Sequence, residues 1–173
     1  EGWNWISFNQ SFPDMTLGSI FDQIDDSPLY IKSQSEYADY YSDFGWFGTL
    51  EYIDNLSMYK INMLESDALA LRGNYINVDS TIFSLSNGWN WIGYSPNNSI
   101  SIETALLNIP SEYATYIKSQ SEYADYYSDF GWFGTLETMH PLSGYLINLN
   151  NGIDFTYNTD DGMNRLNFRE NIY

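Results

Sequence analysis

The stretch YIKSQSEYADYYSDFGWFGTLE occupies residues 30–51, and the same 22 letters return without a change at residues 116–137. The two copies are offset by 86 positions. The same offset aligns GWNWI at residues 2–6 with GWNWI at residues 88–92. Self-similarity at a fixed offset indicates structural units repeated in tandem. The chain therefore reads as Glu1 followed by two repeats.

The repeat reaches further along each copy, because LSMYKIN at residues 56–62 aligns with LSGYLIN at residues 142–148. We predict two small tandem modules, residues 1–87 and residues 88–173. Of the 173 residues, 43% are apolar and 18% aromatic, which is enough to bury a core and argues against disorder.

The pattern inside each repeat predicts an α+β fold with a mostly antiparallel β-sheet and one short helix. Trp3 and Trp5 alternate with polar residues, as do Trp89 and Trp91, so each pair lies on one face of a strand. We expect this face to belong to the core.

Helical spacing occurs once in each repeat. In residues 102–109 the apolar residues recur every three or four positions, Ser101 or Thr104 can cap the start, and Pro110 ends the segment. Residues 17–24 fit the same helix in the first repeat.

The duplicated string itself has two readings. YIKSQ suits a strand, whereas Ser33 and Glu36 could form a capping box that opens a short helix. We favour strands, because GWFGTLE and the alternating segments that follow it continue the strand pattern.

The seam between the repeats reads TIFSLSNGWNWIGY, which places Asn87-Gly88 between two apolar segments and predicts a hairpin of residues 82–86 with residues 89–94. The opening strand of the first repeat would then lack the equivalent partner, and an open apolar edge invites aggregation. An upstream unit, the tail at residues 163–173, or the same tail of a neighbouring molecule could cover it. The last would give a head-to-tail filament.

The charge excludes some classes of function. The chain carries 23 Asp and Glu against 6 Lys and Arg, a net charge of −17, which repels nucleic acid and anionic membranes. A nucleic-acid mimic and an acidic secreted surface that collects Ca²⁺ both fit. We favour the secreted surface, since Tyr and Asn dilute the charge.

Cysteine is absent, so disulfides, thiolate zinc sites and thiol catalysis are excluded. No apolar run approaches the roughly 20 residues of a membrane span. The chain begins without Met or a signal-peptide pattern, and we expect a fragment or a processed product.

Catalytic motifs are scarce. His140 is the single histidine, its counterpart is Asp54, and we expect it in a surface loop. A glycosidase needs only two carboxylates, and four recur in both copies. They are Glu36, Asp39, Asp43 and Glu51, with Glu122, Asp125, Asp129 and Glu137. We expect solvated surface charge and no enzyme.

One segment gathers oxygen ligands around a glycine, NTDDGMN at residues 158–164, without the register of an EF-hand loop. Asn158, Asp160 and Asp161 are its candidate Ca²⁺ ligands, although we favour a simple turn for this segment. Asp25 with Asp26, and Asp39 with Asp43, could also attract cations.

The repeated aromatic residues are the best functional lead, because rings flanked by carboxylates suit sugar binding. The candidate ligand-binding residues are Tyr40, Tyr41, Trp46 and Phe47, with Tyr126, Tyr127, Trp132 and Phe133. Core packing is the alternative for most of them. Trp46 and Trp132 are expected to be exposed, since each has a nearby glycine on both sides.

Three N-x-[ST] sequons begin at Asn9, Asn55 and Asn97, and they matter only if the source glycosylates secreted proteins.

The motifs GWNWIS, YIKSQSEYADYY, GWFGTLE and GYLINL resemble tandem repeats of large secreted or cell-surface proteins of marine and aquatic microbes. The likeness covers both repeats and implies modular architecture and an extracellular or cell-surface location, without an assigned activity. Met58 departs from the pattern, because a glycine stands at that place in LSGYLIN.

Three hypotheses follow. The leading one is a non-enzymatic structural or adhesive repeat module, partnered by neighbouring modules or copies of itself and assembling into a fibre or surface array. The second is a pair of carbohydrate-binding modules, and the third is a glycoside hydrolase.

Overall fold

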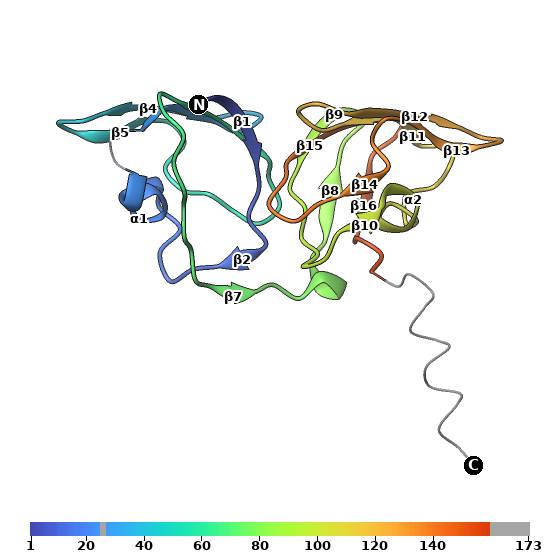
Figure 1. Cartoon of the computed structure of the whole chain (residues 1–173). Coiled ribbons are helices and arrows are strands. Elements are labelled where there is room, and N and C mark those ends of the chain that lie inside the picture. The colour runs from blue at the N-terminus through green and yellow to red at the C-terminus, as the bar shows by residue number, and fades with distance from the viewer. Residues whose placement is uncertain (25–26, 160–173) are drawn as a thin grey trace, which may run out of the picture.

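The computed structural model of the protein describes residues 1–24 and 27–159. Two five-stranded antiparallel sheets form one layer, and the short helices lie beneath it (Figure 1). The structure confirms the predicted α+β class with mostly antiparallel strands.

The sheet of the first repeat has the order β1-β6-β3-β4-β5. Its strands are β1 (Gly2–Ile6), β3 (Pro28–Lys32), β4 (Tyr37–Tyr41), β5 (Gly45–Gly48) and β6 (Tyr59–Met63). Beside it lie β2 (Gln10–Ser11), α1 (Leu17–Phe21), the 3₁₀ turn η1 (Asp22–Ile24) and β7 (Asn74–Tyr75), which pairs with β2.

The sheet of the second repeat has the equivalent order β9-β15-β11-β12-β13, reading the row from the other end. Its strands are β9 (Gly88–Ile92), β11 (Ala114–Lys118), β12 (Tyr123–Tyr127), β13 (Gly131–Gly134) and β15 (Tyr145–Leu149). Around it lie η2 (Val78–Ser80), β8 (Phe83–Leu85), β10 (Ile100–Ser101), α2 (Ile102–Ala105), β14 (Thr138–Met139) and β16 (Ile153–Phe155).

The duplicated string forms strands, as favoured. Ser33 does bond to Glu36, but as a turn between β3 and β4: its N–H donates to the Glu36 carbonyl at 2.9 Å, and its Oγ accepts from the Glu36 N–H at 3.0 Å. The serine half of the predicted capping box is therefore present, and it closes a hairpin instead of opening a helix.

The helices begin where expected. Thr16 caps α1 and Ser101 caps α2, each side chain accepting a backbone N–H three residues on. Helix α2 ends at Ala105, sooner than the periodicity predicted, and a turn continues to Ile109, which is buried.

Each repeat has its own buried cluster beneath its sheet. In the first, Leu17, Ile20 and Phe21 of α1 pack against Ile31 and Ile61 of the sheet. In the second, α2 packs beneath the sheet in the same way, and β8 and β16 add their side chains to the cluster.

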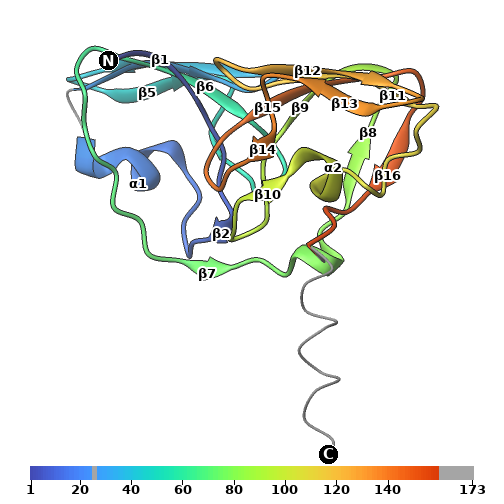
Figure 2. The same cartoon turned by 45° about the vertical axis from the view of Figure 1, so that its right-hand side comes forward.

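The predicted hairpin at Asn87-Gly88 is wrong. Strand β8 pairs with β16, and β9 pairs with β15 (Figure 2). The Asn90 side chain explains the departure, because it bonds to both the N–H and the carbonyl of Ser86 and so takes the place of a ladder partner.

Candidate functional site

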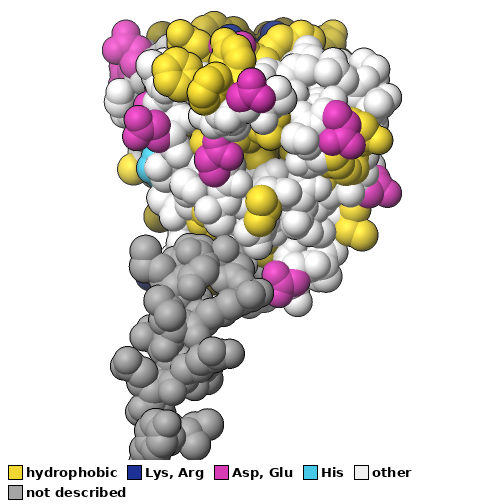
Figure 3. All heavy atoms as spheres, turned by 90° about the vertical axis from the view of Figure 1, so that its right-hand side faces the viewer, with side chains coloured by type: hydrophobic (Ala, Val, Ile, Leu, Met, Phe, Trp, Pro, Cys, Tyr) yellow, Lys and Arg dark blue, Asp and Glu magenta, His cyan; other side chains and the backbone are white. Residues whose placement is uncertain are grey.

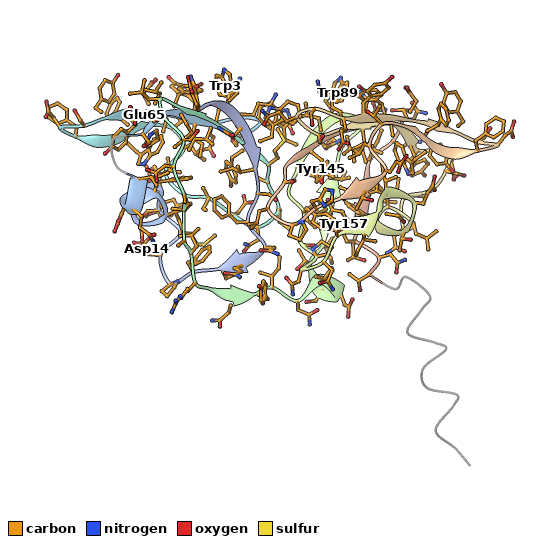
Figure 4. The ribbon with its side chains drawn as sticks, in the orientation of Figure 1. Trp3, Asp14, Glu65, Trp89, Tyr145 and Tyr157 are labelled. Atoms are coloured by element: carbon orange, nitrogen blue, oxygen red, sulfur yellow. The ribbon has the colours of Figure 1, made fainter. Side chains whose placement is uncertain are left out.

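The outer face of the two sheets is built from aromatic side chains that the sequence pattern assigned to the core. Trp3 is 44% exposed and Trp89 is 49% exposed, and both rise from the solvent side of their sheets (Figure 4). The expectation that these tryptophans line the core is wrong. The helices cover only the opposite face, where the buried Ile31 and Ile61 lie.

The rings on this face form a row in each repeat. Trp3 meets Tyr30 edge-on, with ring centroids 5.9 Å apart, and Tyr30 stacks on Tyr37 at 6.0 Å. Asn62 stands between Trp3 and Tyr30 in the strand register, and it is small enough to let the rings meet above it. The second repeat carries the same row at Trp89, Tyr116 and Tyr123, with centroid distances of 5.7 and 6.1 Å.

Three lysines lie between the two rows. The Lys60 ammonium lies 4.0 Å from the ring centroid of Trp5 and 4.4 Å from that of Trp91, so one tryptophan from each repeat contacts it. Lys32 also faces Trp91, at 5.7 Å, and Lys118 faces Trp5, at 5.2 Å. Cation–π attraction favours such pairs.

We call this surface the platform. It comprises Trp3, Trp5, Tyr30, Lys32, Tyr37, Lys60, Trp89, Trp91, Tyr116, Lys118 and Tyr123. Three of the six Lys and Arg residues of this acidic chain are gathered here. In Figure 3 hydrophobic side chains gather along the upper edge, and acidic side chains are scattered beside and below them.

The lysines influence one another. Partial burial lowers the pKa of Lys60, and the positive charges of Lys32 and Lys118 lower it further. The two indole rings act against this by attracting the charged ammonium. A negatively charged group placed here would relieve the repulsion among the three lysines.

The junction between the repeats is held by two reciprocal glutamine side chains. Gln120 of the second repeat accepts the N–H of Trp5 at 2.9 Å and donates to the Trp3 carbonyl at 2.7 Å. Gln34 of the first repeat does the same to β9, accepting from Trp91 at 2.8 Å and donating to Trp89 at 3.1 Å. Each amide thus acts as a short substitute for a strand on the edge of the other sheet.

Backbone bonds repeat the same symmetry. The Ser7 N–H donates to the Leu142 carbonyl at 2.9 Å, and the Gly93 N–H donates to the Leu56 carbonyl at 2.7 Å. These pairs match at the 86-position offset, so the junction has approximate two-fold symmetry. Within the described residues, the second repeat therefore covers the edge of β1 through Gln120. The tail at residues 163–173 lies outside the described residues.

The candidate ligand-binding aromatics divide between the two faces. Tyr40 and Trp46 lie on the inner side, where their rings meet edge-on at 5.2 Å and Trp46 also contacts Phe21 of α1. Phe47 is 75% exposed, and Tyr41 is half exposed. Tyr126, Tyr127, Trp132 and Phe133 repeat this arrangement, with Phe133 at 71%. Trp46 and Trp132 are half-buried, less open than expected.

Glycine at position 48 serves the sheet. A side chain there would collide with the backbone of Tyr37 and Ala38 on the neighbouring strand. The glycine therefore allows β4 and β5 to approach each other closely.

Four buried tyrosines lie under the sheets, including Tyr145 and Tyr157 (Figure 4). Burial raises the pKa of Tyr59, Tyr94, Tyr145 and Tyr157. Near Tyr59 the Asp54 carboxylate adds to this effect. All four therefore keep their protons to higher pH than free tyrosine does.

The polar candidates are dispersed. His140 is exposed in a loop, as predicted, with Nδ1 2.8 Å from the Ser99 hydroxyl. The repeated carboxylates are exposed or half-buried. Within residues 1–24 and 27–159, no group of three or more His, Asp or Glu side chains is close enough to hold a metal ion.

The calcium candidates are only partly described. The backbone N–H of Asn158 donates to the Ala105 carbonyl at 3.1 Å. Asp160 and Asp161 lie outside the described residues, as do Asp25 and Asp26 and the tail at residues 163–173.

The sequons occupy different environments. Asn9 is buried, and its Nδ2 lies 3.3 Å from the Pro96 carbonyl. Asn55 is half-buried and donates to the Phe8 and Gln10 carbonyls, whereas Asn97 is exposed.

Sequence reasoning missed Gln34, Gln120 and the three lysines of the platform. A signal existed, because Lys32 and Gln34 lie inside the duplicated string and return at Lys118 and Gln120. Each of these glutamines bonds to the edge strand of the other repeat, so the recurrence of the pair corresponds to a contact that also recurs.

Within the described part of the chain no helix is long and apolar enough to cross a membrane. In comparisons with known proteins, no family model, no curated protein and no solved structure matched this chain.

Proposed function

We propose that the chain is a non-enzymatic structural module of an extracellular or cell-surface protein, in which two repeat modules, residues 1–87 and 88–173, present the same face twice at a fixed spacing. The observation that supports this most is the reciprocal junction. Gln34 and Gln120 bond each repeat to the edge strand of the other. Identical strings are then needed twice, since each copy must fit the other.

A fixed spacing can be measured directly, because the chain has no cysteine and single labels can be introduced cleanly. Ser42 and Ser128 are equivalent exposed positions in the β4–β5 and β12–β13 turns. Spin labels on Ser42→Cys with Ser128→Cys should give one narrow distance distribution by double electron–electron resonance.

Removing both glutamine side chains, Gln34→Ala with Gln120→Ala, should broaden that distribution, whereas Gln23→Ala, which lies outside the junction, should leave it narrow. A broad distribution in the unaltered chain would refute the fixed spacing. Sedimentation at high concentration then tests assembly into arrays, with a strictly monomeric chain counting against assembly through this fragment.

A second function, binding of carbohydrate, is favoured by the platform. Its two rows of rings can stack on the CH faces of sugars. The lysines between the rows can pair with carboxylate or sulfate groups, so we favour an acidic polysaccharide over a neutral one. Two equivalent rows would bind one long chain with avidity.

A glycan array probed with and without Ca²⁺ tests this function. Trp3→Ala with Trp89→Ala should abolish retention of a bound glycan, and Phe130→Ala, which removes an 80% exposed ring from a loop, is the matched control. Retention that survives the double tryptophan change would refute binding on the platform. Retention lost in chelator would indicate that Ca²⁺ takes part.

A further inference from the structure

The first repeat contains an apolar groove beside the end of β1. Its volume is about 250 Å³, and Ile6, Phe8, Leu69 and Leu71 supply much of its wall. Leu142 of the second repeat also borders it. The groove lies between the end of β1 and the segment that leads from β6 to β7.

The equivalent place in the second repeat is filled by β8. At the 86-position offset, Leu69 and Leu71 correspond to Phe155 and Tyr157. The ring of Phe83 in β8 lies with its centroid 5.3 Å from that of Phe155 and 5.1 Å from that of Tyr157. The same strand pairs in antiparallel register with β16.

The residues around this place are more deeply buried in the second repeat, where β8 covers them, than in the first. Ile92 is 1% exposed, Phe155 3% and Tyr157 2%. Their counterparts Ile6, Leu69 and Leu71 are only half-buried. Residues 67–69, the counterpart of β16, are not part of a strand. In Figures 1 and 2 β8 and β16 run together below the second sheet, whereas the trace from β6 to β7 has no such partner among the described residues.

The segment in the first repeat is nevertheless held in position. The side-chain amide of Gln23 donates from Nε2 to the Ala70 carbonyl at 3.1 Å. In the second repeat the side-chain amide of Asn108 donates from Nδ2 to the equivalent carbonyl, that of Thr156, at 2.9 Å. The same point of the backbone is therefore anchored in both repeats.

The backbone at Gly2 already has the conformation that Gly88 adopts just after β8 in the second repeat. Gly2 has φ +71° and Gly88 has φ +88°, the left-handed region in which glycine is favoured. Asn90 donates to the Gly88 carbonyl at 3.1 Å and bonds twice to Ser86, at the end of β8. Asn4 donates to the Gly2 carbonyl at 3.0 Å, which repeats the bond from Asn90 to the Gly88 carbonyl.

We propose that the groove is the acceptor for a β8-type strand from the repeat unit that lies upstream in a tandem array. The strand would resemble residues 81–86, with an inward phenylalanine and leucine at the positions of Phe83 and Leu85, which are buried, and outward residues at those of Ile82 and Ser84, which are exposed. It would pair with residues 67–69 and fill the groove as β8 does in the second repeat.

This inference rests on the proposed repeat function, and it supplies a contact by which such repeats could extend into an array. The junction between the two repeats is reciprocal, so it closes on itself and cannot extend an array. A strand donated in one direction is a head-to-tail contact, which can propagate. The chain's own tail fits poorly, because Arg169 and Asn171 fall at the offset positions of Phe83 and Leu85.

The test adds a synthetic peptide of residues 79–87, DSTIFSLSN, to the full chain. Calorimetry should show saturable binding, and the methyl resonances of Ile6, Leu69 and Leu71 should shift while that of Ile92 stays in place. A peptide with alanine for its phenylalanine should bind at least about tenfold more weakly, since the ring supplies much of the buried area.

Two variants of the chain sharpen the result. Leu71→Glu should abolish binding, whereas Leu107→Glu, at a 68% exposed position, should not. The peptide sequence fused directly before Gly2 should raise the melting temperature by roughly 2–8 °C, which tests the groove even if Leu71→Glu fails to fold.

No peptide binding together with an unchanged melting temperature of the fusion would overturn the proposal. So would shifts confined to the second repeat, or binding that appears only after residues 160–173 are deleted, since the tail would then be the occupant. None of these results alters the spin-label distance across the junction, so failure of the acceptor groove is distinguishable from failure of the proposed function.

Discussion

Met58 and Gly144 occupy equivalent positions in the two repeats and face each other across the junction. Met58 is fully buried, and a Cβ at Gly144 would collide with the Cγ of Met58. Near an approximate two-fold axis, two methionines would compete for one space and two glycines would leave it empty. The Met58 departure from the repeat pattern is thus what allows two otherwise similar repeats to pack tightly.

Exchanging this pair tests the symmetry of the junction. Gly144→Met should lower the free energy of unfolding by about 1–3 kcal/mol through overpacking, and Met58→Gly should lower it by about 2–5 kcal/mol through the cavity it leaves. The double variant, which moves methionine to the other repeat, should recover most of that loss. Urea unfolding measures all three.

The exchange has a matched control in Gly18→Ala, an exposed helical position with open space for a Cβ. It should stabilise the chain by up to about 1 kcal/mol. If the double variant loses as much free energy of unfolding as the two single variants lose together, the two-fold arrangement is contradicted.

The two glutamines should act on opposite strands. Gln34→Ala should speed hydrogen exchange at the Trp91 N–H and leave the Trp5 N–H unchanged, and Gln120→Ala should do the reverse. Each change removes two hydrogen bonds and should cost about 1–3 kcal/mol. If either variant changed the exchange rates of the Trp5 and Trp91 N–H groups by the same factor, the repeats would not cover each other's edges.

The buried tyrosines predict loss of stability in alkali. Their pKa is raised in the folded chain, so unfolded tyrosine releases its proton first, and the stability present below pH 10 falls as the pH rises above it. Urea midpoints between pH 9 and 11.5 should follow this course. In Tyr94→Phe the fall should be shallower, although the variant loses the bond to the Asn98 carbonyl at all pH values. A slope that Tyr94→Phe leaves unchanged would exclude Tyr94 from the effect.

Asn90 and Asn4 form a natural pair for comparison. Asn90 is buried and bonds to both groups of Ser86, so Asn90→Ala should cost about 1–3 kcal/mol. Asn4→Ala removes one bond at a half-buried position and should cost less. Hydrogen exchange at Ser86 should quicken only in Asn90→Ala. Equal costs in the two variants would contradict the role of Asn90 in holding β8.

Local patterns in the sequence predicted much of the fold. Ser101 caps α2 as expected, and Ile102, Ala105 and Ile109 are buried, because capping and periodicity depend on near neighbours. The exposure of Trp3 and Trp89 was mispredicted, since alternation shows which residues share a face of a strand and leaves open which face is covered.

The sequence by itself determined that a unit is repeated, that both copies form the same mostly antiparallel sheet, and that the chemistry of thiols is excluded. Only the tertiary structure decided that β8 pairs with β16, that Gln34 and Gln120 bind the opposite repeat, and that one groove stays open. These contacts join residues far apart in the chain, and a repeated string is equally compatible with pairing inside a unit and between units. The choice depended on side-chain contacts such as Asn90 with Ser86 and Met58 with Gly144, which no local pattern encodes.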